Sequence, residues 1–515
     1  MDLEEKTPDA SLFVFVGKER RAQDETQVFA HPPISHAKDA WRRFCKNRSA
    51  VVGLVLLLLS AVFCLISPLL TPYTLQDKES AYPNKYPYLP LFEHAGFWDG
   101  GRENDFTQDN YLYFYAIGQE TGHSPILQVK KEYEKIQIIG GVEKRTKMFR
   151  LRIQTYKEVG VVNGINLSAA DFQKLCDYQS QSGRQVLYPL VDTTKLHGFD
   201  LAEGGGNYWY AIDAKGKPQL DGNGELQPVY LSVPQGDAAL QYAPYESLRV
   251  AGDDGTYVYG RANQSGYATR ICYWEYYRYL HGRLPSYAFG TNTYGQDIFC
   301  ALGKGAGFSL LLAVVVSALN LCIGVLYGAV EGYYGGGVDL AMERICDVLS
   351  GIPFTVTVTL FGYHLAAKVG VVVSFVFAFL ATGWISTAAL TRKQFYRFKN
   401  REYVMAARTL GASDWRIMRK HIFPSSIGTV ITSAAMLIPS VIGVETTLTY
   451  LGIVNLSAAG TTSLGTLIEL GKGCLDTAPH VVLFPALFLA MIMIAFNLLG
   501  NGLRDALNPS LRFTK

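Results

Sequence analysis

Long stretches of the chain contain no Asp, Glu, Lys or Arg, and shorter charged segments separate them. A helix that crosses the hydrocarbon core of a bilayer needs about 20 consecutive, mostly apolar residues. Six charge-free stretches reach this length: residues 49–76, 305–330, 348–367, 369–391, 422–444 and 477–503. The pattern therefore predicts an all-α polytopic membrane protein with six transmembrane helices.

The distribution of Lys and Arg predicts the orientation, because short loops that stay in the cytosol retain positive charge. Basic residues cluster before the first stretch, between the fourth and the fifth, and after the sixth. The two connections that alternate with these regions hold one basic residue each, Lys368 and Lys472. We therefore expect both termini and the segment 391–424 in the cytosol, and residues from about 72 to 304 outside.

The first stretch is expected to remain in the mature protein. Mostly polar residues 1–48 precede it, and no small-residue cleavage site clearly ends its apolar run, so it does not resemble a signal peptide. Residues 1–48 are predicted to be a cytosolic tail and residues 49–71 the first transmembrane helix.

Residues 72–289 form a connection long enough to be a domain. It contains 24 of the 32 tyrosines, and its alternating stretches predict strands, a helix and a turn. The strands are expected at residues 128–138, 148–155 and 255–260, the turn at 213–224, and the helix at 168–179, with Ser168 as its cap and Asp171 three residues on. The sequence predicts a large β-rich α+β extracytoplasmic domain inserted between the first two helices.

One aromatic run in this domain, YWEYYRYL at residues 273–280, has two interpretations. Tyr and Trp are favoured at protein interfaces, so the run suits a contact surface for a binding protein or for cargo. Packing of the same rings in the core of the domain is the alternative. Cys176 and Cys272 also leave two alternatives open, since an oxidising compartment permits a disulfide between them and both could equally remain thiols.

Composition and motifs argue against a soluble protein and against catalysis. The chain is 49% hydrophobic and only 18% charged, and its net charge of +3 is too small to indicate nucleic-acid binding. The nearest approach to a phosphate-binding loop, residues 303–309, has its Lys too early, and neither H-E-x-x-H nor C-x-x-C occurs. We therefore expect no catalytic site, no metal and no ATP hydrolysis in this chain.

Residues 401–424, REYVMAARTLGASDWRIMRKHIFP, form a basic, helix-compatible segment between two apolar stretches. Glu402 near a helix start suits the positive end of the helix dipole. Gly411, with the two residues after it, provides a turn before Asp414, which is expected to cap a second helix. Small side chains at Ala406, Ala407 and Ala412 permit close approach of a partner. The segment is predicted to be a short rigid lever, and a merely solvated basic loop is the alternative.

This segment resembles the EAA loop of binding-protein-dependent ABC importer permeases, in the variant of the C-type subunit of dipeptide, oligopeptide and nickel importers. Ala406, Ala407 and Gly411 stand at the places of the two alanines and the glycine of that loop, and Pro424 stands at its end. Met405 replaces the glutamate of the motif, and Phe423 replaces a leucine.

The resemblance covers residues 41–72 and 290–515. GTNTYGQDIF at 290–299, EGYYGGGVD at 331–339 and AFNLLGNGLRDALNPSLR at 495–512 are similar to further family motifs. Within the first of these motifs and shortly after it, the chain departs from the family pattern at four positions where acidic residues or arginine are customary: Asn292, Gln296, Ala301 and Gly307. The inserted domain is far longer than the connection typical of the family, so the resemblance implies nothing about it.

The resemblance implies a type I ABC importer permease core at residues 290–515, with five transmembrane helices and the coupling loop 391–424, in a prokaryotic cell membrane. Its implied partners are a second homologous permease subunit, two ABC ATPase subunits that bind ATP and Mg, an extracytoplasmic solute-binding protein and a peptide substrate. The residues expected to contact the ATPase are Glu402, Met405, Ala406, Ala407, Arg408, Gly411, Ala412 and Pro424. A membrane-anchored receptor or surface enzyme, or a scaffold, is the alternative function.

Two further features concern the membrane helices. Glu445 is the only acidic residue between His421 and Glu469, so it either reaches the outer interface from a helix end or lines the translocation pathway. Gly324, Gly328 and Gly332 lie four residues apart, a spacing that lets helices approach closely, within one subunit or between two.

Overall fold

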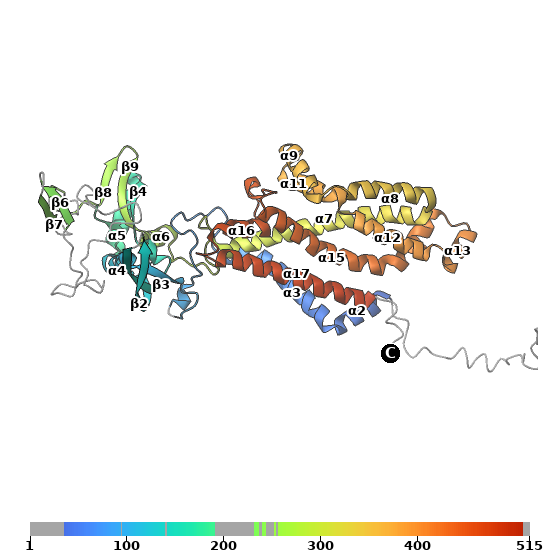
Figure 1. The fold of residues 1–515 in the computed structure, drawn as a ribbon, viewed down its shortest axis with the longest axis horizontal. Helices are drawn as coiled ribbons and strands as arrows, with labels where there is room; N and C mark the ends of the chain where they lie inside the picture. The colour runs from blue at the N-terminus through green and yellow to red at the C-terminus, as the bar shows by residue number, and fades with distance from the viewer. Residues whose placement is uncertain are drawn as a thin grey trace, which may run out of the picture.

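The computed structural model describes residues 36–93, 95–139, 142–190, 231–235, 239–243, 252–253 and 256–507. The turn expected at 213–224 lies outside these ranges. Figure 1 shows an elongated molecule in which a helix bundle carries a mixed α/β region at one end, while helix α13 lies at the other. The bundle helices are α2 (His36–Lys46), α3 (Arg48–Leu70), α7 (Ile298–Tyr334), α8 (Gly336–Ser350), α9 (Phe354–His364), α10 (Ala366–Val369), α11 (Val371–Thr382), α12 (Ile385–Phe398), α13 (Glu402–Thr409), α14 (Asp414–Ile417), α15 (Phe423–Tyr450), α16 (Leu464–Gly471) and α17 (His480–Leu507).

Five helical segments in the described part of the chain are long and apolar enough to cross a membrane, or up to six if a bent pair counts as one span. They are Arg48–Leu70, Ile298–Tyr334, Val371–Phe398, Asp414–Tyr450 and His480–Leu507, together with the bent pair α8 and α9. The predicted apolar helices are therefore confirmed, although their limits differ from those of the charge-free stretches.

The third predicted span, residues 348–367, is not one straight helix. Helices α8 and α9 meet there at an angle of 77°. Pro353 precedes α9 as its N-terminal cap residue, and a proline has no N–H with which to continue the hydrogen bonds of α8. Asp347 and Arg344 form an exposed ion pair on α8, so the helix extends through charged residues that the charge-free criterion excluded.

Helices α7 and α12 pack closely along the glycine stripe. An added Cβ at Gly324 would lie 2.7 Å from Trp384 O, one at Gly328 would lie 2.1 Å from Ala388 O, and one at Gly332 would lie 2.7 Å from Arg392 O. The three glycines therefore serve packing within this subunit, which decides between the two alternatives for the stripe.

In its described residues, the region between α3 and α7 contains three antiparallel sheets and three α-helices. In the first sheet β3 (Val142–Gln154) lies between β1 (Gly101–Thr107) and β2 (Ile126–Ile139). In the second, β9 (Gly266–Cys272) pairs with β4 (Val161–Leu167), β5 (Leu187–Tyr188) and β8 (Gly260–Asn263), and the third pairs β6 (Leu231–Gln235) with β7 (Ala239–Ala243). The helices are α4 (Gln108–Thr121), α5 (Ala169–Ser182) and α6 (Tyr273–His281).

Several local predictions for this region can be compared with the structure. The strands expected at 128–138 and 148–155 correspond to β2 and β3. Ser168 caps α5 by accepting the backbone N–H of Asp171, as predicted. The strand expected at 255–260 is wrong, because β8 begins only at Gly260. Asn263 of β8 pairs with Gly266 of β9 across a tight turn. The residues of β8 that pair with β9 are therefore those directly before this turn.

Tyrosines form much of the core of this region. Tyr82, Tyr88, Tyr156, Tyr277 and Tyr287 are among the largest fully buried side chains in the described residues. The run at 273–280 is helix α6, and its Tyr273, Trp274 and Tyr277 are buried in this core, so the packing interpretation holds for these rings. Cys176 and Cys272 are thiols and do not form a disulfide.

Candidate functional site

The site is built on α13, a turn, and α14. Glu402 is the first residue of α13, as its favourable interaction with the helix dipole predicts. Gly411 has a φ of +78°, the left-handed conformation that glycine adopts without steric cost, and it turns the chain toward α14. Asp414 is not the cap of α14. Ser413 holds the cap position, and Asp414 is the first helical residue.

The inner face of the site is apolar and packs against the ends of two long helices. Val404 of α13 is buried with Tyr333 of α7 and Phe395 of α12. Ile417 at the end of α14 belongs to the same cluster, as do Met418 and Ile422 of the π-helical segment Met418–Ile422 that follows. Ala407 also lies on the buried face, whereas Ala406 is exposed. The two alanines of the motif therefore differ in exposure, and of the two only Ala406 is open to a partner.

Polar contacts fix the same elements to the end of α7. The hydroxyl of Tyr333 donates to Asp414 Oδ1 at 2.5 Å, and Arg408 Nη2 donates to the Tyr333 hydroxyl at 3.3 Å. Tyr333 thereby connects α13 and α14 to the helix that runs the length of the bundle. Sequence reasoning missed this tyrosine, although it lies in the family-like segment 331–339.

A second polar cluster lies just behind the site and joins α7, α8 and α12. The guanidinium of Arg392 donates to both carboxylate oxygens of Asp339, at 2.6 and 2.9 Å, and to both of Glu343, at 2.7 and 3.1 Å. Glu331 lies 3.5 Å from the same guanidinium. Paired bidentate contacts of this kind hold three helices in a defined geometry. The signal in the sequence that could have indicated this cluster is its three acids, Glu331, Asp339 and Glu343.

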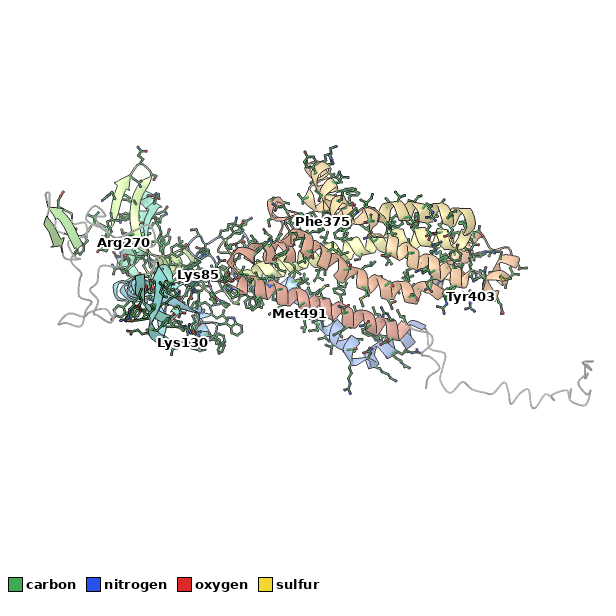
Figure 2. All side chains as sticks on the ribbon, in the orientation of Figure 1. Lys85, Lys130, Arg270, Phe375, Tyr403 and Met491 are labelled. Carbon is green, nitrogen blue, oxygen red and sulfur yellow. The ribbon has the colours of Figure 1, made fainter. Side chains whose placement is uncertain are left out.

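The outer face of the site exposes large apolar side chains next to small ones. Leu410 is 88% exposed, and Tyr403, Met405 and Trp415 are also exposed. Figure 2 labels Tyr403 at the end of the bundle remote from the mixed α/β region. Arg408, Gly411 and Pro424 are exposed on the same segment, and Ala412 is half-buried. Such a patch of apolar side chains on a solvent-exposed loop is typical of a protein contact surface.

Glu445 lies inside the bundle and not at its surface, with only 1% of its area exposed. Ser463 Oγ donates to its Oε1 at 2.6 Å, and Ser309 Oγ donates to its Oε2 at 3.0 Å. Thr446 and Thr449 add contacts of 3.4 Å each. The expectation that this carboxylate reaches the outer interface from a helix end is wrong, because it fixes α16 to α7 and α15 instead. It does not line an open pathway in this structure.

No group of three or more His, Cys, Asp or Glu residues that could hold a metal ion occurs in the described ranges. The polar clusters named above lie within residues 256–507, and each acid in them faces an arginine or hydroxyl groups. The arrangement at α13 and α14 therefore suits mechanical contact with another protein.

Comparison with known proteins gives two family matches. Residues 320–513 match the family described as "Binding-protein-dependent transport system inner membrane component", and residues 35–90 match the "N-terminal TM domain of oligopeptide transport permease C". The inserted region lies almost wholly outside both matches.

Individual relatives match a little under half of this chain. The oligopeptide transport system permease protein OppC of Bacillus subtilis (strain 168) is 38% identical over 224 residues, which are 44% of this chain and 72% of that protein. The dipeptide transport system permease protein DppC of the same organism is 37% identical over 44% of this chain and 69% of that protein. The glutathione transport system permease protein GsiD of Pectobacterium atrosepticum is 32% identical over 47% and 78%, respectively.

A solved structure of the MetNI methionine ABC transporter in an inward-facing conformation is 15% identical, with a TM-score of 0.35, over 40% of this chain and 96% of that chain. The relatives are transport permease subunits and not enzymes. The family match at residues 320–513 includes the loop described above. The chain therefore belongs to the family of binding-protein-dependent transport system inner membrane components, as a multi-pass permease subunit of the C-type oligopeptide and dipeptide branch.

Proposed function

We propose that this chain is one of two membrane-spanning permease subunits of an ATP-driven importer for oligopeptides or dipeptides. The names of the similar OppC and DppC proteins support the peptide as substrate. The second permease would complete the translocation pathway, and separate ATPase subunits would bind ATP and Mg. An extracytoplasmic solute-binding protein would deliver the peptide.

The observation that carries the proposal is the two-sided loop at residues 401–424. Its outer face presents Met405, Leu410 and Trp415 around the small residues Ala406 and Gly411, and this is the surface that an ATPase subunit would grip. Its inner face is buried against α7 and α12. A displacement of α13 is therefore transmitted to the helices of the bundle rather than absorbed within a flexible loop.

Helix α7 is the element that would carry the displacement. Its 37 residues span about 55 Å at 1.5 Å per residue, from Tyr333 at the coupling loop to Ile298 next to the mixed α/β region. Converting a gate from 1:99 to 99:1 requires about 5.5 kcal/mol of differential binding. We identify no source of this energy in the chain itself, so ATP binding and hydrolysis by partner subunits would supply it.

The proposed topology follows from the positive-inside distribution. Residues 1–48, the loop 391–424 and the C-terminus would lie in the cytosol, and the inserted domain 72–289 would lie outside. The placement of α13 and the mixed α/β region at opposite ends of the bundle is compatible with this topology. The inserted domain would help to receive cargo from the binding protein, or would guard the entrance itself.

We also propose a role for Glu445 in the pathway, which would require a change in the packing of the helices around it. The carboxylate is buried among four hydroxyl groups, so it could meet a peptide only in a state in which α16 separates from α7 and α15. A buried carboxylate is costly inside a bilayer unless its hydrogen bonds are satisfied, and here they are satisfied by the protein.

The coupling proposal is tested by Gly411→Val in a reconstituted complex of this chain, the second permease, the ATPases and the binding protein. A β-branched residue at a φ of +78° costs more than the 1–2 kcal/mol roughly expected for any side chain in this conformation, so the turn should distort. We expect peptide uptake and peptide-stimulated ATP hydrolysis to fall about tenfold, equivalent to about 1.4 kcal/mol of lost coupling.

Gly460→Val is the matched control. Gly460 has a φ of +69° and, like Gly411, nothing within 4 Å of an added Cβ, but it lies outside the coupling loop. Uptake by the control should stay near that of the unmodified protein. Normal uptake by Gly411→Val, or a purified complex that contains no ATPase, would refute the assignment of the loop.

A further inference from the structure

A rigid apolar loop projects from the inserted region close to the bundle. We define the apolar loop as residues 89–93 and 95–98, with Leu91, Phe92, Phe97 and Trp98 as its large side chains. Main-chain hydrogen bonds close it: Leu89 N donates to Trp98 O at 2.8 Å, and Phe92 N donates to Leu89 O at 2.9 Å. The rings of Phe92, Phe97 and Trp98 contact one another, with centroids 5.2 to 6.1 Å apart.

The loop exposes its largest apolar groups instead of burying them. Leu91 is 87% exposed, Phe97 52% and Trp98 41%. Trp98 also has a φ of +50°, a left-handed conformation that is unfavourable for a bulky side chain. Strain of this kind persists where the surrounding structure imposes it, and it is concentrated at functional positions. The fold therefore holds these rings outward against both hydration and backbone preference.

The position of the loop indicates what covers it. Trp98 Nε1 donates to Ala288 O at 2.7 Å, ten residues before α7 begins. Phe97 and Trp98 line one pocket together with Phe484, a residue in the second turn of α17. The rings thus lie level with the first turns of a candidate span. At 1.5 Å per residue, Phe484 is only about 6 Å along the axis from the start of α17.

The lipid-facing surface of the bundle continues from this point. Leu483 and Leu487 of α17 are exposed, as are Leu69 and Leu70 at the end of α3. The apolar loop therefore lies at the same end of the bundle as exposed apolar side chains of the candidate spans. Trp in particular is enriched where the hydrocarbon core meets the headgroups, because it combines an apolar body with one N–H donor.

The charges near the apolar loop are already paired within the protein. Glu93 accepts from Lys157 at 2.7 Å, and Asp99 accepts from Arg152 at 2.8 Å. Arg152 also donates to Gly96 O at 2.6 Å. Among the described residues of the loop and its direct neighbours, Glu93 and Asp99 are thus each paired with a basic side chain. The outward chemistry of the loop is apolar and aromatic.

We propose that the apolar loop inserts Leu91, Phe97 and Trp98 into the interface of the bilayer leaflet that faces the inserted region. The loop anchors this region to the lipid surface beside α17. It thereby fixes the height and tilt of the inserted region above the mouth of the bundle, whatever solute is transported. Figure 2 labels Lys85 at this junction between the two parts of the molecule.

Quenching of tryptophan fluorescence by brominated lipids tests the proposal. The full-length chain is placed in phosphatidylcholine nanodiscs whose acyl chains carry bromine near the headgroup, and is compared with Trp98→Phe. We expect the quenched part of the emission to be smaller in the variant, since the lost signal came from a ring in contact with lipid. Trp274→Phe is the matched control, because Trp274 is buried in the core of the inserted region, and its removal should leave the quenched part unchanged.

Two further arms distinguish lipid from protein. Phe97→Trp places an additional reporter in the same loop and should increase the quenched emission, which keeps the test available if Trp98→Phe does not fold. The measurement is repeated in the assembled transporter with its partner permease and binding protein. The proposal is overturned if Trp98→Phe, Phe97→Trp and the unmodified chain are all quenched to the same extent. Loss of the Trp98 signal from lipid on assembly overturns it too, because a protein subunit then covers the loop.

Discussion

Glu445 places a buried carboxyl group at the point where α7, α15 and α16 meet. Ser463 Oγ donates to Glu445 and accepts from the N–H of Thr466, and Ser309 Oγ donates to Glu445 and accepts from the N–H of Leu464. Each serine hydroxyl therefore links the carboxyl group of Glu445 to a backbone N–H in the first turn of α16. The N-terminal end of a helix also favours negative charge. In this conformation Glu445 holds α16 against α7 and α15 through these hydrogen bonds.

Replacing the carboxylate should therefore weaken this junction. In Glu445→Ala the hydroxyls of Ser309 and Ser463 lose their acceptor, and each unsatisfied buried group costs about 1–3 kcal/mol. We expect a lower melting temperature in detergent, with a smaller loss in Glu445→Gln, which keeps one acceptor oxygen. The exposed Ser457 provides the control Ser457→Ala, which should melt like the unmodified chain. Peptide uptake separates the roles, since normal uptake by Glu445→Gln would exclude an essential charge in the pathway.

Residues whose role depends on the adjacent few positions were predictable. The cap at Ser168 and the place of Glu402 at a helix start follow from local hydrogen bonding and from the helix dipole. The surroundings of Glu445 were not predictable, because Ser309 lies 136 residues away in the sequence. Tyr333 was missed for the same reason, since its partner Asp414 is 81 residues further on.

At the scale of elements, the contact of α7 with α12 sets the width of the bundle. An added Cβ at Gly328 would lie 2.1 Å from the backbone oxygen of Ala388, which cannot move without the helix. Gly328→Ala should therefore force the helices apart, at a cost of about 1–3 kcal/mol, and lower the melting temperature in detergent. Gly337→Ala on the exposed side of α8 meets nothing within 4 Å. It should be neutral or stabilising by up to about 1 kcal/mol, and equal melting of the two variants would contradict the packing argument.

The apolar elements were the most predictable part of the fold, because length and hydropathy alone decide whether a helix can cross a bilayer. Their ends were less so. Helix α7 begins before Lys304, and α8 contains the Asp339 that pairs with Arg392, so charged residues inside a helix were mistaken for boundaries. The sequence shows the proline at position 353, but it does not predict the angle between α8 and α9. Strand β8 was misplaced because its register depends on β9.

At the scale of the whole molecule, the two ends of the bundle differ in kind. One end presents a small two-helix loop with an exposed Leu410, and the other carries sheets that are packed with a core rich in tyrosine. Hydrogen bonds cross the second junction directly, such as the one from the Tyr86 hydroxyl to Thr477 O at 3.1 Å. The inserted region is therefore tied to the ends of the spans and is not a loosely tethered addition. Its position should report on any movement of α17.

The proposed topology predicts opposite accessibility for the two ends. Cys45 and Cys322, the exposed cysteines among the described residues, are first replaced by Ser. Gln264→Cys in the exposed turn between β8 and β9 should then react with a membrane-impermeant maleimide added to intact cells. Met405→Cys, whose parent side chain is 57% exposed, should react only after the membrane is permeabilised. Reaction of both in permeabilised cells is the control for accessibility. Labelling of Met405→Cys in intact cells would place the coupling loop outside, where no ATPase subunit could reach it, and would remove the basis of the proposed mechanism.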